Sequence, residues 1–233
     1  MDLKRFFTEE NIIGEVAVLT GEEFIHAVKV TRHKVGFELI ICDNSGFDYY
    51  CEVTSIEKDR LVAKVKSKTL NDTNLNQEIN LFIGVNKDLD TVIQKAVELG
   101  VSTVTPFYSQ HTNVEKINYQ RLNKIVLESC KQCGRAILTK INDIVSFEEM
   151  AKLRDNNYFF YEFERDNKVI DAKLKVNEPI NIIIGGEGGF SKEEATIMLS
   201  LGACSLTLGK RILRVSTAVV SAVTLVLQKI GEV

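Results

Sequence analysis

The chain has 233 residues, of which 45% are hydrophobic and 26% are charged, a composition typical of an ordinary globular protein with one or two domains. Its most apolar stretch, Ala218–Leu227, is about half as long as the roughly 20 residues that a membrane span requires, which excludes a spanning helix there. The net charge of −3 excludes a surface that is basic overall, so any contact with nucleic acid must come from local clusters.

Cysteine usage points to a reducing compartment. The five cysteines are odd in number and lack the spacing of a disulfide framework, and no signal peptide is recognisable, so we expect a cytoplasmic protein. Cys130 and Cys133 form a C-x-x-C motif deep inside a predicted helix, without a second pair or a nearby histidine. Neither a zinc site nor a redox pair is expected there, and we predict no metal.

The first 70 residues contain short strand-like runs separated by turn signals. In one run Leu61, Ala63 and Val65 occupy every second position, as expected of a strand with one buried face. The predicted strands are Glu15–Leu19, Glu38–Cys42, Tyr49–Ile56 and Arg60–Lys66, and the one predicted helix runs from Glu22 to about Val30. Closely spaced short strands favour a small β-barrel.

A polar stretch without periodicity, Ser67–Glu78, follows the barrel and predicts a linker. We therefore divide the chain into a barrel domain at residues 1–70, a linker at 71–78 and a second domain at 79–233. The second domain alternates between strand and helix patterns, which predicts an α/β fold with a largely parallel sheet. Its predicted strands are Ile79–Val85, Thr103–Pro106, Tyr158–Tyr161, Ile180–Ile184 and Ser205–Leu208, and its helices are Leu89–Leu99, Tyr119–Arg135, Ser191–Leu201 and Val215–Ile230.

A glycine-rich stretch in this domain is the strongest candidate for a ligand site. The predicted strand Ile180–Ile184 runs into Gly185-Gly186-Glu187-Gly188-Gly189, and Ser191 with Glu194 then forms a capping box that starts a helix. Four glycines expose bare backbone at the carboxyl end of a strand, where open α/β sheets bind their ligands. The stretch fits neither a phosphate loop nor a dinucleotide fingerprint. The alternative is a tight strand-to-helix turn.

Two basic stretches are candidates for binding an anion. Leu206–Ala218 carries Lys210, Arg211 and Arg214 between a short strand and an apolar helix, where they could hold a phosphate or carboxylate or form a solvated loop. In the first domain, cations stand beside aromatic residues, a combination that suits RNA but also occurs on solvated surfaces. These residues are Lys4-Arg5-Phe6-Phe7 and the basic run His26, Lys29, Arg32, His33 and Lys34.

The motifs, in this order, resemble the SPOUT family of 16S ribosomal RNA uracil-N3 methyltransferases over essentially the whole chain. The resemblance rests on their combination, because each motif alone is weak. The matching residues are Arg5-Phe6-Phe7, His26 with Val30 and Arg32, Lys87, Glu98-Leu99-Gly100-Val101 with Pro106, Gln132-Cys133-Gly134-Arg135, Gly185 with Glu187-Gly188-Gly189-Phe190-Ser191, and Leu208-Gly209 with Arg211-Ile212-Leu213-Arg214 and Thr217-Ala218.

This resemblance implies a PUA-like β-barrel followed by an α/β domain whose carboxyl-terminal region is tied into a trefoil knot. It further implies a homodimer packed through the last helix, and S-adenosylmethionine-dependent methylation of N3 of a uridine in small-subunit ribosomal RNA, free or in the assembled subunit. The implied catalytic residues are Arg214 and Arg211, and the implied RNA-binding residues are Arg5, His26, Arg32, Lys87 and Arg135. The implied cofactor-binding residues are Tyr161, Gly185, Gly186, Glu187, Gly188, Gly189, Leu208, Gly209, Ile212 and Leu213.

Four residues at three places depart from the family pattern. Gly186 stands in place of a proline, Ser216 in place of a glutamate, and Gln110-His111 in place of an acidic–arginine pair. The missing glutamate leaves open an RNA-binding protein with weakened or lost catalysis. A SPOUT methyltransferase acting on another RNA position, such as a ribose 2′-hydroxyl or a transfer RNA base, is a further alternative. A nucleotide-binding enzyme lacks its motif.

Overall fold

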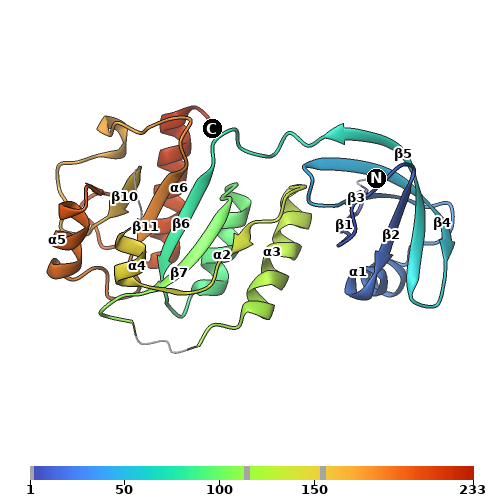
Figure 1. Cartoon of the computed structure of the whole chain (residues 1–233), viewed down its shortest axis with the longest axis horizontal. Coiled ribbons are helices and arrows are strands. Elements are labelled where there is room, and N and C mark those ends of the chain that lie inside the picture. The colour runs from blue at the N-terminus through green and yellow to red at the C-terminus, as the bar shows by residue number, and fades with distance from the viewer. Residues whose placement is uncertain (1–2, 113–115, 153–155) are drawn as a thin grey trace. The chain divides into compact units, whose positions relative to one another are not determined.

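The computed structural model describes residues 3–112, 116–152 and 156–233. By their internal contacts the residues form two compact units (Figure 1). One comprises Met1–Asn74 with Leu127–Leu138, and the other comprises Leu75–Val126 with Thr139–Val233. The predicted domain boundaries remain a proposal. The contacts assign residues 127–138, which lie in the second half of the chain, to the amino-terminal unit.

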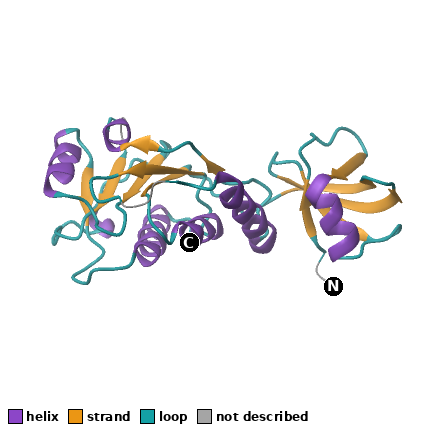
Figure 2. Ribbon diagram, turned by 90° about the horizontal axis from the view of Figure 1, so that it is seen from below, coloured by secondary structure: helices purple, strands orange, loops and turns teal. Residues whose placement is uncertain are grey.

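The amino-terminal unit is a curled five-stranded sheet around an apolar core (Figure 2). β1 (Arg5–Phe7) pairs in parallel with β3 (Glu38–Cys42), and the remaining pairs are antiparallel, in the order β1-β3-β4-β5-β2. The other strands are β2 (Val16–Thr20), β4 (Phe47–Ile56) and β5 (Arg60–Leu70). The strands bury apolar side chains in this core, and the predicted strands are confirmed, whereas the short β1 was not predicted.

The predicted helix at Glu22–Val30 lies where expected, but its winding changes midway. α1 (Gly21–Ile25) continues into η1 (His26–Val30), a π-helical turn closed by the Thr31 N–H, which donates to the His26 carbonyl at 2.9 Å. The Thr31 hydroxyl also donates to the Ala27 carbonyl at 2.9 Å. Because a π turn re-aims the residues that follow it, Arg32 leaves the helix with a φ of 57° and an exposed side chain.

The polar stretch Ser67–Glu78 is not a linker over its whole length, and the linker at 71–78 stays a prediction. β5 continues to Leu70, because Ser67, Lys68, Thr69 and Leu70 pair with Tyr50, Tyr49, Asp48 and Phe47. The Lys68 ammonium lies 3.8 Å from the centre of the Phe47 ring, a cation–π contact that suits a polar strand end. A strand whose side chains are all exposed at this end has no apolar alternation, so its pattern looked like a linker.

The carboxyl-terminal unit is built on a parallel sheet in the order β12-β10-β11-β6-β7-β8, with β9 also pairing with β7. Its central strands are buried on both faces, as their continuous apolar runs predicted. The strands are β6 (Ile79–Gly84), β7 (Thr103–Tyr108), β8 (Lys140–Ile141), β9 (Val145–Ser146), β10 (Asn157–Phe160), β11 (Ile180–Ile184) and β12 (Cys204–Leu206).

Helices cover both faces of this sheet (Figure 2). α2 (Leu89–Glu98) and α6 (Val215–Ile230) pack together on one face, whereas side chains of α4 (Phe147–Ala151) and α5 (Lys192–Ser200) share a core cluster on the other. α3 (Tyr119–Cys133) and the short η2 (Val169–Asp171) complete the unit, except that α3 from Leu127 onwards belongs to the amino-terminal unit. Among the described residues no helix is long and apolar enough to cross a membrane.

These elements confirm the predicted α/β class and the ends of the last helix. β8, β9 and α4 were not predicted, because two-residue strands carry no periodicity and α4 has only five residues. The trefoil knot implied by the resemblance stays a prediction.

Candidate cofactor and active site

A cavity of about 640 Å³ lies at the carboxyl ends of the neighbouring strands β12, β10, β11 and β6. Open α/β sheets bind ligands at this edge, and the volume lies within the usual range for a small-molecule site. The lining residues are Lys87, Asp88, Phe160, Tyr161, Glu162, Ile184, Gly185, Gly186, Glu187, Gly188, Gly189, Leu208, Gly209, Arg211, Ile212, Leu213, Arg214, Val215 and Ala218.

The cavity brings together every residue that the sequence analysis assigned to cofactor binding and both arginines assigned to catalysis. It also contains Lys87, which was assigned to RNA. The Lys87 backbone N–H donates to the Glu187 carboxylate at 3.4 Å, a long hydrogen bond that joins the loop after β6 to the glycine loop. Glu162, Asp88 and Phe160 were missed. A single charged residue after a strand carries no motif, so no signal in the sequence could have singled out Glu162.

The glycine loop is a close-packed turn of bare backbone. A Cβ atom on Gly84, at the end of β6, would lie 2.2 Å from the Gly186 nitrogen, so the two backbones touch where any side chain would separate them. Gly189 has a φ of 64°, and its N–H donates to the Gly186 carbonyl at 3.0 Å, which closes the turn. Residues 185–189 therefore form a tight turn, and the same bare backbone leaves a surface that a ligand can approach closely.

The predicted capping box is confirmed and has a second function. The Ser191 hydroxyl accepts from the Glu194 N–H at 3.1 Å, and the Glu194 carboxylate accepts from the Ser191 N–H at 2.9 Å. The same buried carboxylate also accepts from the Gln110 N–H at 2.8 Å. This contact holds the segment with Gln110 and His111 beside the glycine loop, where a Cβ on Gly188 would lie 2.7 Å from the His111 Cβ.

The second wall of the cavity is the loop between β12 and α6. Arg211 and Arg214 are both exposed, and Arg214 is the N-cap residue of α6 with an extended backbone. The first turn of α6 contains no acidic residue, and its first N–H groups have no acceptor within the helix. The positive end of the helix dipole and two guanidinium groups thus form one electropositive edge.

The third wall is the loop after β10, which carries Tyr161 and Glu162. Glu164 fixes this loop: its carboxylate accepts the backbone N–H groups of Arg165, Asp166 and Asn167 and the Ser205 hydroxyl. The Ser205 hydrogen bond is the largest influence on the carboxyl, and it lowers the pKa of Glu164 to about 2. The loop is held at its far end as well, because the Thr207 N–H donates to the Asn167 carbonyl at 2.8 Å.

In the amino-terminal unit, Arg5 does not face solvent as an RNA-binding residue should. Its side chain is 9% exposed and forms a bidentate ion pair with Asp48, with Nη2 and Oδ2 2.9 Å apart. The Asn71 side-chain amide donates to the same carboxylate at 3.1 Å and to the Gly134 carbonyl at 3.0 Å. Desolvation raises the pKa of Asp48, but the hydrogen bonds from Arg5 and Asn71 outweigh it and leave the pKa lowered.

Arg135 is buried as well, with 5% of its surface exposed, and burial lowers the pKa of its guanidinium. The geometry therefore assigns Arg5 and Arg135 to the interior of their unit. Sequence spacing could not show this, because Asp48 lies 43 positions from Arg5.

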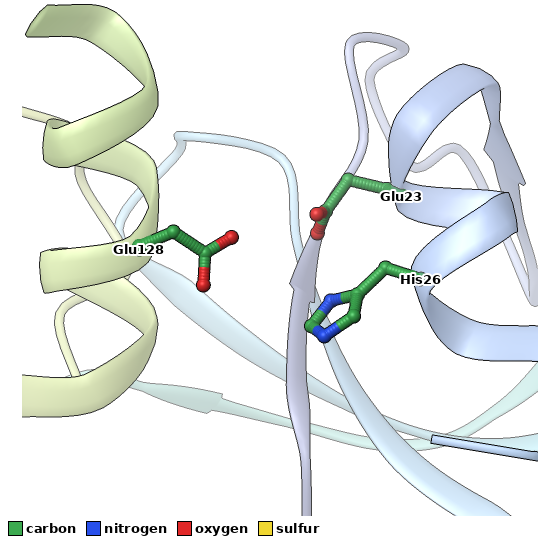
Figure 3. A group of neighbouring side chains, drawn as sticks. All are labelled: Glu23, His26 and Glu128. Atoms are coloured by element: carbon green, nitrogen blue, oxygen red, sulfur yellow. The ribbon is translucent and has the colours of Figure 1, made fainter. Parts of the chain in front are cut away.

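His26 and Arg32 lie at the surface of the amino-terminal unit. Figure 3 shows Glu23, His26 and Glu128 side by side, and their candidate ligand atoms all lie within 4.8 Å of one another. The Lys131 ammonium lies among these groups and donates to Glu23 at 2.9 Å, to His26 Nδ1 at 2.9 Å and to Glu128 at 3.0 Å. A lysine thus supplies positive charge to this cluster of two carboxylates and a histidine.

Comparison with known proteins agrees with this arrangement. A model of the RNA methyltransferase domain matches residues 73–227, and a model of the RNA methyltransferase PUA domain matches residues 19–66. The chain is 34% identical to the ribosomal RNA small subunit methyltransferase E of Mesomycoplasma hyopneumoniae, over 94% of this chain and 97% of the relative. It is 29% identical to the protein of that name in Buchnera aphidicola, over 99% of this chain and 95% of the relative.

Solved structures share the fold over nearly the full length. A ribosomal RNA small subunit methyltransferase E from Neisseria gonorrhoeae, bound to S-adenosyl methionine, superposes with a TM-score of 0.90 at 25% identity, covering 97% of this chain and 98% of that chain. A probable rRNA-methyltransferase from Porphyromonas gingivalis gives a TM-score of 0.86 at 22% identity, with coverage of 97% and 98%. The predicted fold, an α/β domain joined to a PUA-like domain, is thereby confirmed.

Proposed function

Since this chain belongs to the RNA methyltransferase family, we propose that it transfers a methyl group from S-adenosylmethionine to N3 of one uracil in small-subunit ribosomal RNA. The observation that carries the proposal is the cavity itself. Bare backbone forms one wall, and two exposed guanidinium groups line the same space. The family membership agrees with the resemblance given by the sequence motifs.

The residues of the cavity fit this cofactor. Its volume suits a nucleoside with an amino-acid chain, and the glycine loop offers backbone N–H and C=O groups that no side chain covers. Backbone of residues 185–189 and 208–213 would hold the nucleoside part, with Leu208, Ile212 and Leu213 supplying apolar contact. The bound cofactor supplies a methyl group already activated on a sulfonium, so the protein contributes binding, orientation and electrostatics.

Arg211 and Arg214 act on the acceptor base. Loss of the N3 proton to solvent spreads negative charge over the uracil oxygens, and nearby cations favour that anionic form. Guanidinium groups fixed beside the oxygens stabilise the charge where it develops, and the N-terminus of α6 adds to the same positive field. Because N3 is hydrogen-bonded in a duplex, the target base enters unpaired or flipped out.

The amino-terminal unit holds the RNA backbone. The exposed Lys29, Arg32 and Lys34 lie on η1 or within four residues of its end, and the half-buried His26 lies at the start of η1, where these groups would contact phosphates. Arg5 and Arg135 take part indirectly, by fixing the fold that carries these groups. We therefore propose His26, Arg32 and Lys87 as the residues that contact RNA.

A homodimer in the cytoplasm completes the proposal. α6 is buried along one side by α2 and β11, while Val220 and Leu225 on the same helix remain 36% and 39% exposed. Ile212, directly before α6, is 87% exposed. Exposed apolar side chains next to a ligand cavity are typical of a surface covered by a second subunit.

Methyl transfer tests the proposal directly. Purified protein is incubated with methyl-labelled S-adenosylmethionine and either small ribosomal subunits or naked small-subunit RNA, and the digested RNA is analysed by mass spectrometry. We expect one N3-methyluridine. Label on a ribose or on another base would replace the proposed target. Cofactor and RNA binding without any transfer would favour an RNA-binding protein that has lost catalysis, as Ser216 in place of a glutamate suggests.

A further inference from the structure

The Glu162 carboxylate lies in the cavity, against the bare backbone of the glycine loop. It follows β10, the strand that lies between β12 and β11, so it stands between the two loops that form the main walls of the cavity. A Cβ atom on Gly189 would lie 2.3 Å from Glu162 Oε2 and 2.7 Å from Oε1. The carboxylate therefore lies against the glycine loop, in space that a side chain at position 189 would compete for.

The position of Glu162 is set by its loop. The Tyr161 N–H donates to the Leu206 carbonyl at 3.1 Å, and the Glu164 N–H donates back to the Tyr161 carbonyl at 3.1 Å. Within residues 3–112, 116–152 and 156–233, no lysine or arginine forms an ion pair with Glu162. The Glu162 carboxylate thus lies in the ligand cavity, and no ion pair among the described residues engages it.

We propose that Glu162 binds the α-ammonium group of the amino-acid part of the cofactor, an inference that rests on the proposed function. S-adenosylmethionine carries two positive groups, the ammonium and the sulfonium, and a carboxylate is the group that pairs best with either. Glu162 is therefore a binding residue that fixes which end of the cavity the amino-acid part occupies.

The ammonium is the better partner for two reasons. The sulfonium loses its charge as the methyl group leaves, so a carboxylate beside it would stabilise the reactant more than the transition state and slow the transfer. The ammonium keeps its charge throughout. In addition, Glu162 contacts Gly189, which follows β11. Arg211 and Arg214 lie on the loop after β12, where the proposed function locates the acceptor base.

Calorimetry with three ligands separates these roles. S-adenosylhomocysteine keeps the ammonium but lacks the sulfonium, and 5′-methylthioadenosine lacks both. Glu162→Gln keeps the shape of the side chain and removes its charge. The matched control is Glu193→Gln, in the first turn of α5, which does not line the cavity. Burial, followed by the charges of Glu162 and Glu193, raises the pKa of Tyr161, so the control removes a nearby charge of the same sign.

We expect Glu162→Gln to weaken the binding of S-adenosylmethionine and of S-adenosylhomocysteine by the same factor. That factor should be roughly tenfold or more, as is typical for the loss of a charged hydrogen bond. Binding of 5′-methylthioadenosine should stay unchanged, as should all binding by Glu193→Gln. Thermal unfolding of both variants shows whether they fold.

Three results for the Glu162→Gln variant would overturn the inference. Its affinity could be unchanged for every ligand, or its affinity for 5′-methylthioadenosine could fall as much as for the other two. Its affinity could also fall for S-adenosylmethionine alone, which would place the carboxylate at the sulfonium. If the unaltered protein binds neither S-adenosylmethionine nor S-adenosylhomocysteine, the proposed function fails instead.

Discussion

The arginines of the two units have opposite fates. Arg211 and Arg214, in the carboxyl-terminal unit, are exposed and line a cavity of bare backbone. In the amino-terminal unit Arg135 is buried, and the Arg5 side chain is only 9% exposed and is neutralised by Asp48. All four lie in motifs that pointed to ligand binding. For Arg5 the difference has a clear cause: the fold provides an internal acid, Asp48, that binds the guanidinium in place of a ligand.

The largest effect should follow from removing an exposed arginine. Arg214→Ala is expected to lower the rate of methyl transfer by roughly 100-fold to 1,000-fold, the usual loss when one donor to a developing negative charge is removed. S-adenosylmethionine affinity should change by less than about twofold, because the guanidinium acts on the acceptor base. Single-turnover transfer and calorimetry measure the two quantities. Unchanged turnover would remove Arg214 from the mechanism.

The next largest effect is a loss of stability when Arg5 loses its ion-pair partner. Asp48→Ala leaves the Arg5 guanidinium buried without its acid and should lower the free energy of unfolding by about 3 kcal/mol. The control is Glu57→Ala, which breaks the exposed ion pair with Arg60 and should change stability far less, because water screens that pair. Urea denaturation followed by circular dichroism measures both. Equal losses would show that Arg5 is not a structural cation.

A glycine outside the glycine loop tests the close approach of two backbones. In Gly84→Ala the new Cβ would meet the Gly186 nitrogen at 2.2 Å, so the glycine loop must shift. Overpacking of this kind lowers the free energy of unfolding by about 1–3 kcal/mol. Because the displaced backbone belongs to the cavity wall, calorimetry should also show weaker cofactor binding. Gly14→Ala, where a Cβ meets nothing within 4 Å, should leave that affinity unchanged. Tight binding by the Gly84 variant would contradict the proposed role of this contact.

A smaller effect is expected for an exposed cation of the amino-terminal unit. Arg32→Gln should weaken binding of small-subunit RNA several-fold and reduce the slope of log affinity against log salt by about one, as for one lost phosphate contact. Arg5→Gln would differ in kind, since it should lower stability first. Fluorescence titration at several salt concentrations gives the slope. An unchanged slope would exclude Arg32 from the RNA interface.

The smallest expected effect is a pH dependence of stability that differs between the two units. Burial lowers the pKa of His33 below its ordinary value of 6.5, so the unfolded chain binds this proton more readily and stability falls as pH drops below about 6.5. The pKa of Glu164 is lowered from 4.5 to about 2, so its contribution is complete above about 4.5 and is lost as pH falls towards 2. Denaturation between pH 4.5 and 7 should therefore report the amino-terminal unit, and His33→Gln should flatten that dependence.

The sequence predicted those features that depend on local pattern. Four clustered glycines after a buried strand located the cavity wall, the Ser191–Glu194 spacing located the start of α5, and an apolar run located α6. It failed where partners come from far along the chain. The pairing of Arg5 with Asp48, the tie from Glu194 to Gln110 and the contact of Glu162 with Gly189 join segments that only the folded chain brings together.

The most direct test of the whole account is a crystal structure of the protein soaked with S-adenosylmethionine. The account predicts density for the cofactor between residues 185–189 and 208–213, with its amino-acid part at Glu162 and its methyl group towards Arg211 and Arg214. Density elsewhere, or a cavity that stays closed by its own side chains at saturating cofactor, would contradict it.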